Sequence, residues 1–249
     1  MPMSHKRFYV PRDCIRDSGA VLPPGQAHHL RDVMRIKAGD IVEIFDGTGR
    51  GYSGDVEYLD STVLIRNLRS LPPEEPSIRI VLAAALVRPS KFEWMLQKAT
   101  ELGVDEFVPL KTSRSEARLA EGKVLSRIER WNRIVQEASR QCRRLSAPQI
   151  RMPRDFSDFL ETIDDYSCTK LLFYENAETP WKFDPDILSN HVLLCIGPEG
   201  GWENGEVEEA ARAGCQIFSL GSRTLRAETA AVAALSVVQY HVNLFSRHH

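Results

Sequence analysis

The sequence predicts an α/β protein in which a small β-rich domain precedes a larger domain with a mostly parallel sheet. Strand-like and helix-like patterns alternate from residue 78 onward, which is typical of parallel sheets. The first 70 residues instead contain short alternating runs separated by turn residues. Prolines and glutamates at 71–76 separate the two patterns, so we place the domains at 1–72 and 73–249.

Length and composition restrict the class of protein. A chain of 249 residues, 43% of them hydrophobic, can form one or two domains with a real core. Residues 1–13 lack the apolar segment of a signal peptide, and the five cysteines are scattered without a CxxC pair, so we expect a cytoplasmic protein. The run Thr229–Ser246 contains no charged Asp, Glu, Lys or Arg residue, but its polar residues favour a buried helix over a membrane span.

The expected N-terminal domain has four strands and one short helix around 28–34. A glycine-rich segment, Phe45–Gly51, resembles the loop of Rossmann-like methyltransferases, but that loop should open a helix. Here it lies between two strand patterns, so we predict a hairpin turn. The four strands are expected at Arg7–Val10, Ile41–Phe45, Tyr52–Tyr58 and Thr62–Leu68.

The second domain begins with Ile78–Val87, an apolar run expected for a strand buried on both faces. Ser90 and Glu93 form the pattern of a capping box, so a helix is predicted from Ser90 to Leu102. The further strands are expected at Val104–Leu110, Lys170–Glu175, His191–Ile196 and Gln216–Leu220, and the further helices at Val124–Leu145, Glu203–Ala213 and Ala227–Phe245.

Three of these strands are followed by unusual loops: 174–176, Gly197–Trp202 and Gly221–Thr229. In parallel sheets, ligands bind at the carboxyl ends of strands. Glycines let backbone amides approach a ligand closely, and a helix N-terminus attracts negative charge. The alternative for the second loop is a tight strand-to-helix turn without a ligand.

Charge is distributed unevenly although the net charge is −2. Residues 111–154 carry 12 basic and 4 acidic side chains, a local charge of +8. Such a patch attracts phosphate backbones, or it forms only the solvated face of a helix. The histidines show no HExxH pattern and no GxxxxGK[ST] occurs, so neither a metal site nor a phosphate-binding P-loop is expected.

The loops after the last two predicted strands contain motifs that resemble those of a known protein family. Ile196–Trp202, Leu220-Gly221 and Leu225–Ala230 resemble the SPOUT methyltransferases, and more narrowly the RsmE family. Gln97–Val104 and Arg7–Tyr9 match the same family. Members methylate N3 of a decoding-region uridine in 16S ribosomal RNA of the small subunit, with S-adenosylmethionine as methyl donor. One departure is that the family often has Lys then Arg where this chain has Arg88 and Lys91, which are not interchangeable cations.

The resemblance implies a PUA-like β-barrel that binds RNA, followed by a SPOUT domain with a C-terminal trefoil knot. It also implies a homodimer, with the uncharged last helix as the natural contact, acting on 16S rRNA or the assembled small subunit without a metal or membrane. The cofactor would lie bent in the knot, held mainly by backbone groups. The residues assigned to it are Leu172, Phe173, Tyr174, Glu175, Ile196, Gly197, Pro198, Gly200, Gly201, Ser219, Leu220, Gly221 and Leu225.

Methylation of uracil N3 requires removal of its proton, or stabilisation of the anion as it forms. Arg226 is the first catalytic candidate, because it could stabilise charge on the uracil carbonyl oxygens. Glu199 is the second catalytic candidate, as the acceptor of the N3 proton. The alternative is that Glu199 only stabilises the conformation of its loop. Glu228 is a further possible acceptor, or a carboxylate favoured by the helix dipole.

Contact with RNA is expected from arginines of the basic segment and of the barrel, because guanidinium groups bind phosphates. The alternative for Arg144 is an ion pair with Glu101 or Glu137 that only stabilises the fold. The residues expected to contact RNA are Arg7, Arg114, Arg140, Arg143 and Arg144.

Two other functions fit the sequence. One is a SPOUT methyltransferase that acts on transfer RNA or on a ribose 2′-oxygen, which the RNA substrate and modified nucleoside would distinguish. The other is a non-catalytic RNA-binding protein that uses the barrel and the basic helix. This last protein would need no cofactor pocket.

Overall fold

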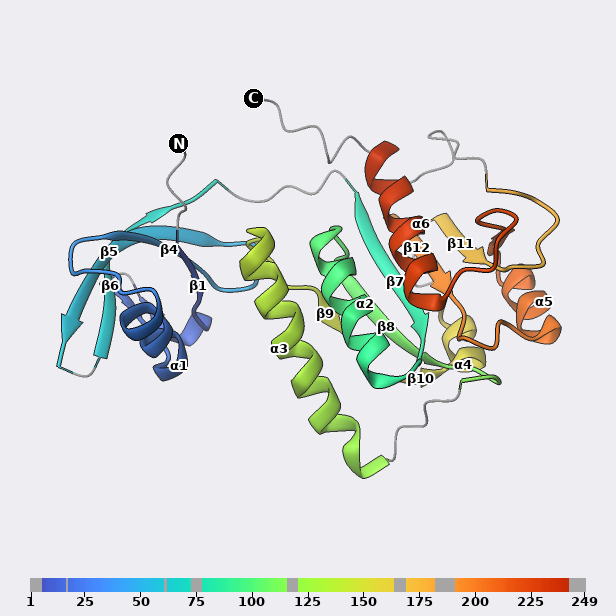
Figure 1. Cartoon of the computed structure of the whole chain (residues 1–249), viewed down its shortest axis with the longest axis horizontal. Coiled ribbons are helices and arrows are strands. Elements are labelled where there is room, and N and C mark those ends of the chain that lie inside the picture. The colour runs from blue at the N-terminus through green and yellow to red at the C-terminus, as the bar shows by residue number, and fades with distance from the viewer. Residues whose placement is uncertain are drawn as a thin grey trace. The chain divides into compact units, whose positions relative to one another are not determined.

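The computed structural model describes residues 6–16, 18–60, 62–72, 78–115, 121–163, 169–181 and 191–241. These residues form two compact units (Figure 1). The first contains the described residues up to 72 together with 136–147, and the second contains 78–135 and the described residues from 148 onward. Most of the predicted linker lies outside the described residues.

The first unit is a six-stranded sheet in the order β1-β4-β5-β6-β3-β2. Its pairs are antiparallel except for β1 with β4, and β4 and β5 form the predicted hairpin across the glycine-rich turn. The core contains apolar side chains that alternate along the strands, among them Phe8, Ile44 and Ile65, each 0% exposed. The strands are β1 (Arg7–Tyr9), β2 (Ile15–Arg16), β3 (Gly19–Val21), β4 (Ile41–Phe45), β5 (Gly51–Leu59) and β6 (Thr62–Ser70).

The helical segment of this unit begins earlier than predicted. Helix α1 spans Pro24–His28 and continues into a π-helical turn at His29–Val33. Pro24 takes the first helical position, where a missing N–H costs nothing, so the helix begins there rather than near residue 28. Strands β2 and β3 are absent from the sequence prediction because they are too short for a periodic pattern.

The second unit contains the predicted parallel sheet, in the order β10-β8-β7-β12-β11-β13 with β9 paired to β8. All its strand pairs are parallel. The central strand β12 is buried along all but its first residue, as expected where both faces are covered. The strands are β7 (Arg79–Ala85), β8 (Glu106–Lys111), β9 (Gln149–Ile150), β10 (Arg154–Asp155), β11 (Thr169–Phe173), β12 (His191–Ile196) and β13 (Gln216–Phe218).

Helices cover both faces of this sheet. Ile80 and Leu82 of β7 pack in one core with α2, α6 and the part of α3 that belongs to this unit, whereas Val81 and Ala83 pack in a second core with α4 and α5. Figure 1 shows α2 beside α6, in agreement with their direct contact. The helices are α2 (Pro89–Glu101), α3 (Val124–Cys142), α4 (Phe156–Glu161), α5 (Asn204–Arg212) and α6 (Ala227–His241).

The predicted capping box of α2 is wrong. Pro89 takes the first helical position, so Ser90 lies inside the helix, and the cap residue Arg88 makes no side-chain cap hydrogen bond. Glu93 instead binds Arg130 of α3, with two hydrogen bonds of 2.6 Å. A capping box forms at α5, where the side chains of Glu203 and Glu206 and their backbone amides satisfy one another.

Helix α3 ends three residues before its predicted end. Arg143 adopts a left-handed backbone conformation with φ 67°, which terminates the helix after Cys142. Leu145 is nevertheless buried, as its apolar spacing predicts, because it packs beneath Gly51 of β5. The last residues of this helix and the loop to residue 147 therefore belong to the first unit.

Helix α6 ends at His241 in the described part of the chain, and the predicted continuation to Phe245 lies outside it. Among the described residues, no helix has both the length and the apolar character needed to cross a bilayer. The trefoil knot that the resemblance implies stays a prediction.

Candidate functional site

The ends of three parallel strands meet at one edge of the second sheet. Phe173 of β11 is aligned with Ile196 of β12 and with Phe218 of β13, so the loops that follow these strands converge. Between them lies a pocket with about 470 Å³ of empty space, partly open to solvent. It is lined by Phe173, Tyr174, Glu175, Ile196, Gly197, Pro198, Gly201, Trp202, Ser219, Leu220, Gly221, Arg223, Leu225, Ala227 and Ala230.

This lining contains every residue assigned to the cofactor from the sequence except Leu172 and Gly200. Leu172 is fully buried in the core on the α4–α5 face of the sheet, because neighbouring strand residues point to opposite faces. A Cβ at Gly200 would meet the Arg114 side chain at 3.1 Å. Trp202, Arg223, Ala227 and Ala230 also line the pocket and were not predicted to do so, although Trp202 belongs to the motif Ile196–Trp202.

Trp202 holds the loop after β12 against the end of β11. Its indole Nε1 donates a 3.0 Å hydrogen bond to the Phe173 carbonyl, and its ring stacks on Phe156 with centroids 4.6 Å apart. The indole is 1% exposed and lies against Gly197, where a Cβ would come within 2.9 Å of Nε1. The glycine and the tryptophan of this motif therefore pack as a unit, which accounts for both residue types.

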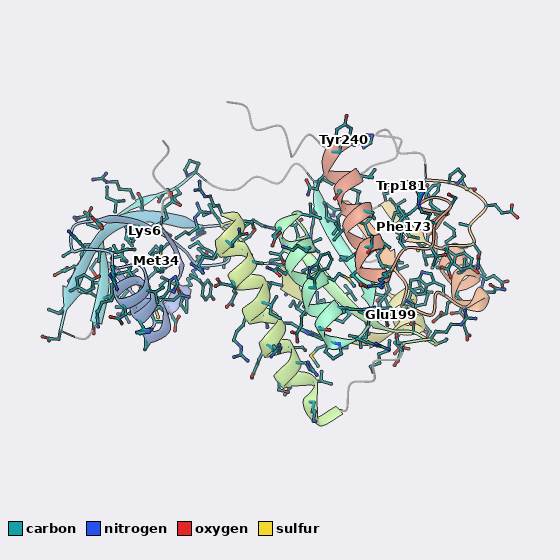
Figure 2. All side chains as sticks on the ribbon, viewed as in Figure 1. Lys6, Met34, Phe173, Trp181, Glu199 and Tyr240 are labelled. Atoms are coloured by element: carbon teal, nitrogen blue, oxygen red, sulfur yellow. The ribbon has the colours of Figure 1, made fainter. Side chains whose placement is uncertain are left out.

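Backbone and hydroxyl groups shape the other two loops. The Tyr174 amide donates to the Phe218 carbonyl at 2.9 Å, and the Gly221 amide donates to the Ser219 hydroxyl at 3.3 Å. Phe173 also packs edge-on against Trp181, with ring centroids 4.9 Å apart (Figure 2). The pocket is thus built from glycines, apolar side chains, strand-end backbone and a few polar side chains, among them Glu175 and Arg223, a composition suited to a ligand with both apolar and charged parts.

Glu199, the predicted proton acceptor, lies in the loop after β12 (Figure 2), between Pro198 and Gly201 of the pocket lining in the chain. Its carboxylate accepts a 2.8 Å hydrogen bond from the ammonium of Lys91 at the start of α2. Glu228, in the first turn of α6, lies 3.8 Å from the same ammonium. The structure brings together the two carboxylates named from the sequence, and it adds a lysine between them.

Arg226, the first catalytic candidate, is exposed and does not line the pocket. Its side chain forms no ion pair with a described residue, so the guanidinium is available to a ligand. Arg223 of the same loop lines the pocket directly. Arg223 lies within the loop predicted from the sequence after β13, but was not among the single residues assigned to the cofactor.

Two arginines predicted to contact RNA have structural partners. Arg7 has a guanidinium only 12% exposed, which pairs with Glu43 at 2.7 Å and donates to the backbone carbonyl of Arg143. These partners fix the position of the guanidinium, and its contact with RNA stays a prediction. Arg114 donates to the Gly200 carbonyl at 3.1 Å and lies 3.6 Å from Glu203, so it supports the pocket loop while half exposed.

The other three predicted RNA contacts follow one another at the end of α3. Arg143 is exposed, and Arg144 lies 3.5 Å from the Ser146 hydroxyl. The two glutamates considered as partners of Arg144 pair with other cations. Glu137 pairs with Arg140 one turn later, and Glu101 pairs with Lys98 at 2.8 Å.

A second hollow lies in the first unit, and the sequence analysis missed it. Arg12, Arg16 and Arg50 line it, together with Tyr52, and all three arginines are exposed. None of the three forms an ion pair with a described residue. These arginines are scattered along the sequence and come together only through the sheet, so no local pattern could have identified them. Among the described residues, no group of three or more possible metal ligands occurs.

Comparisons with known proteins agree with this geometry. Residues 73–239 match a model described as an RNA methyltransferase domain, and residues 22–62 match one described as an RNA methyltransferase PUA domain. The ribosomal RNA small subunit methyltransferase E of Synechocystis is 33% identical over 93% of this chain and 76% of its own length. The ribosomal RNA small subunit methyltransferase E of Bacillus subtilis is 29% identical over 88% of this chain and 89% of its own length.

A solved structure of the ribosomal RNA small subunit methyltransferase E from Neisseria gonorrhoeae, bound to S-adenosyl methionine, has a similar fold. It aligns with a TM-score of 0.82 and 27% identity over 95% of this chain and 97% of that one. The match with the methyltransferase domain extends over more than half of the chain. The chain therefore belongs to the family of the ribosomal RNA small subunit methyltransferase E proteins.

Proposed function

We propose that the protein transfers a methyl group from S-adenosylmethionine to N3 of a uridine in the decoding region of 16S ribosomal RNA. The pocket at the ends of β11, β12 and β13 is the observation that carries this proposal. The resemblance of its loops to the RsmE motifs supports uridine N3 as the methylated atom. Membership of the family supports ribosomal RNA of the small subunit as the substrate. We place the reaction in the cytoplasm, on free rRNA or on the small subunit.

The residues of the pocket fit S-adenosylmethionine. A Cβ at Gly197 would crowd Trp202 and a Cβ at Gly201 would overlap Glu175, two residues of the lining, whereas a Cβ at Gly221 would meet no atom within 4 Å. Backbone groups of 219–221 and the apolar side chains of Ile196 and Leu225 would hold the nucleoside part. When bound, the cofactor supplies an electrophilic methyl group on a sulfonium.

The protein's own groups must then prepare the uracil. Its N3 lies on the Watson–Crick edge, so the target must be unpaired or turned out of its helix. Glu199 would accept the N3 proton, because it directly follows Pro198 of the pocket lining in the chain and carries a carboxylate. Arg226 would stabilise the negative charge that develops on the carbonyl oxygens, since its guanidinium makes no ion pair with a described residue.

The first test compares rRNA from cells with and without the gene. Mass spectrometry of nucleosides from 16S rRNA should show 3-methyluridine with the gene and its loss without it. Reintroduction of the gene should restore the signal. An unchanged 16S rRNA, with a methyl group lost from transfer RNA or from a ribose 2′-oxygen, would contradict the proposal and favour another SPOUT substrate.

We propose that Arg7, Arg114, Arg140, Arg143 and Arg144 contact the phosphates of the RNA, and that the hollow of Arg12, Arg16 and Arg50 adds to these contacts. Arginine binds phosphate through paired N–H groups, and each such contact releases counterions. In the same cells, a gene carrying Arg140→Ala and Arg144→Ala should restore less 3-methyluridine than the unaltered gene. Full restoration would place the RNA contacts elsewhere.

We also propose a homodimer in which α6 forms part of the contact. Tyr240 is 71% exposed near the end of this helix, and Val237 is partly exposed. Sedimentation equilibrium should give about twice the 28.2 kDa of one chain. Val237→Glu should produce monomers or aggregates, because a charge would be buried without a partner. A fully active monomer at nanomolar concentration would contradict the dimer.

A further inference from the structure

Lys91, Glu199 and Glu228 form a charged cluster at the edge of the pocket. The Lys91 ammonium lies 2.8 Å from Glu199 and 3.8 Å from Glu228. Pro198 and Ala227, which line the pocket, directly precede the two glutamates in the chain. The cluster therefore connects the start of α2, the loop after β12 and the start of α6, three segments far apart in sequence.

Helix energetics do not explain the lysine. Lys91 is the third residue of α2, where the helix dipole disfavours a cation, and the first turn of α2 contains no acidic residue. Its side chain is 28% exposed, so part of its hydration is also lost. The two carboxylates must compensate for both effects. This arrangement indicates that the position of the ammonium serves the pocket rather than the helix.

The glutamates depend on this lysine. Glu199 is 21% exposed and Glu228 13% exposed, and Lys91 is the cation that faces both. The Oε2 atom of Glu228 is buried without a hydrogen-bond partner among the described residues. Glu228 also gains from the N-terminal end of α6, whereas Glu199 lies in a loop and has no such support.

We infer that Lys91 is a positioning residue for methyl transfer, which fixes the Glu199 carboxylate and ties its loop to the start of α6. This inference rests on the proposed function, because it assigns Glu199 the role of proton acceptor. A carboxylate on a loop samples several rotamers, and misplacement by about 1 Å can cost about 10²-fold in rate. Lys91 would restrict Glu199 to one of them without touching the substrate.

The experiment uses the full-length protein and compares three variants in methyl transfer to 16S rRNA. Lys91→Met should lower kcat about 10²-fold, while KM for RNA and Kd for S-adenosylmethionine change less than about threefold. Lys91→Arg keeps the charge and should recover most of the loss. Lys98→Met, on the same helix, removes the partly exposed pair with Glu101 and should leave kcat unchanged.

A double-mutant cycle separates positioning from stability. If Lys91 acts through Glu199, then adding Lys91→Met to Glu199→Gln should lower kcat little further. Additive losses would overturn the inference, as would a Lys91→Met protein whose lower melting temperature and weaker cofactor binding account for its lower activity. If the wild-type protein methylates rRNA and Lys91→Met does so equally well, only this inference fails. A wild-type protein that does not methylate rRNA contradicts the proposed function itself.

Discussion

Gly201→Val is expected to weaken binding of S-adenosylmethionine at least about 100-fold, which is about 2.7 kcal/mol. Gly201 has φ 72°, a left-handed conformation that is strongly unfavourable for a β-branched side chain. A Cβ at this position would also overlap Oε1 of Glu175, another residue of the pocket lining. The strained backbone at Gly201 would disturb the loop after β12, and the Glu175 carboxylate would have to move aside.

Isothermal titration calorimetry of the purified variant measures this loss. Gly205→Val is a matched control, because Gly205 lies in the first turn of α5 without a positive φ, and a Cβ added there would have no neighbouring atom within 4 Å. The control should bind within about threefold of the wild type, since it disturbs no contact of the pocket. Unimpaired binding by a folded Gly201→Val protein would show that the cofactor does not depend on this loop.

The second large effect concerns the free energy of unfolding. It involves the start of β8 in the second sheet, at the end of the strands opposite to the pocket. Glu106 begins β8 with a fully buried carboxylate that pairs with Arg79 at 2.6 Å and with Arg151 at 2.8 Å. Replacing both arginines by methionine removes these cationic partners from a buried charge. We expect a loss of about 3–5 kcal/mol in the free energy of unfolding, because burial of the charge is no longer compensated.

Urea denaturation followed by circular dichroism measures the change. Adding Glu106→Leu to the two methionine substitutions should restore most of the stability, because the buried charge is then gone. Arg66→Met serves as the control, since its pair with Glu57 is about half exposed and contributes less than about 1 kcal/mol. A double methionine variant as stable as this control would mean that the carboxylate is not held by its arginines.

The sequence predicts best what depends on local pattern. Continuous apolar runs identified the central strands such as His191–Ile196, because burial on both faces leaves a clear signature. The glycine loops after β12 and β13 pointed to the pocket, because parallel strands bring their carboxyl ends to one edge. The two-residue strands β9 and β10 have no such pattern and were missed.

Long-range pairs explain most of what the sequence could not show. Lys91 and Glu199 are separated by 108 positions, and Glu106 and Arg79 by 27, so no local spacing connects them. Arg7 is a further example. Its charge and motif predict a contact with RNA, whereas its partners Glu43 and Arg143 are visible only once the first sheet is formed.

Helix α3 makes the first unit a discontinuous domain. Residues 124–135 belong to the second unit and 136–142 to the first, within one uninterrupted helix. A fragment cut at residue 72 would lack Leu145, whose side chain covers Gly51, and would lose the Arg143 carbonyl that binds Arg7. The RNA-binding unit therefore cannot be transferred to another enzyme as residues 1–72 alone. A fusion protein would also need the segment 136–147, which lies between two parts of the catalytic domain in the sequence.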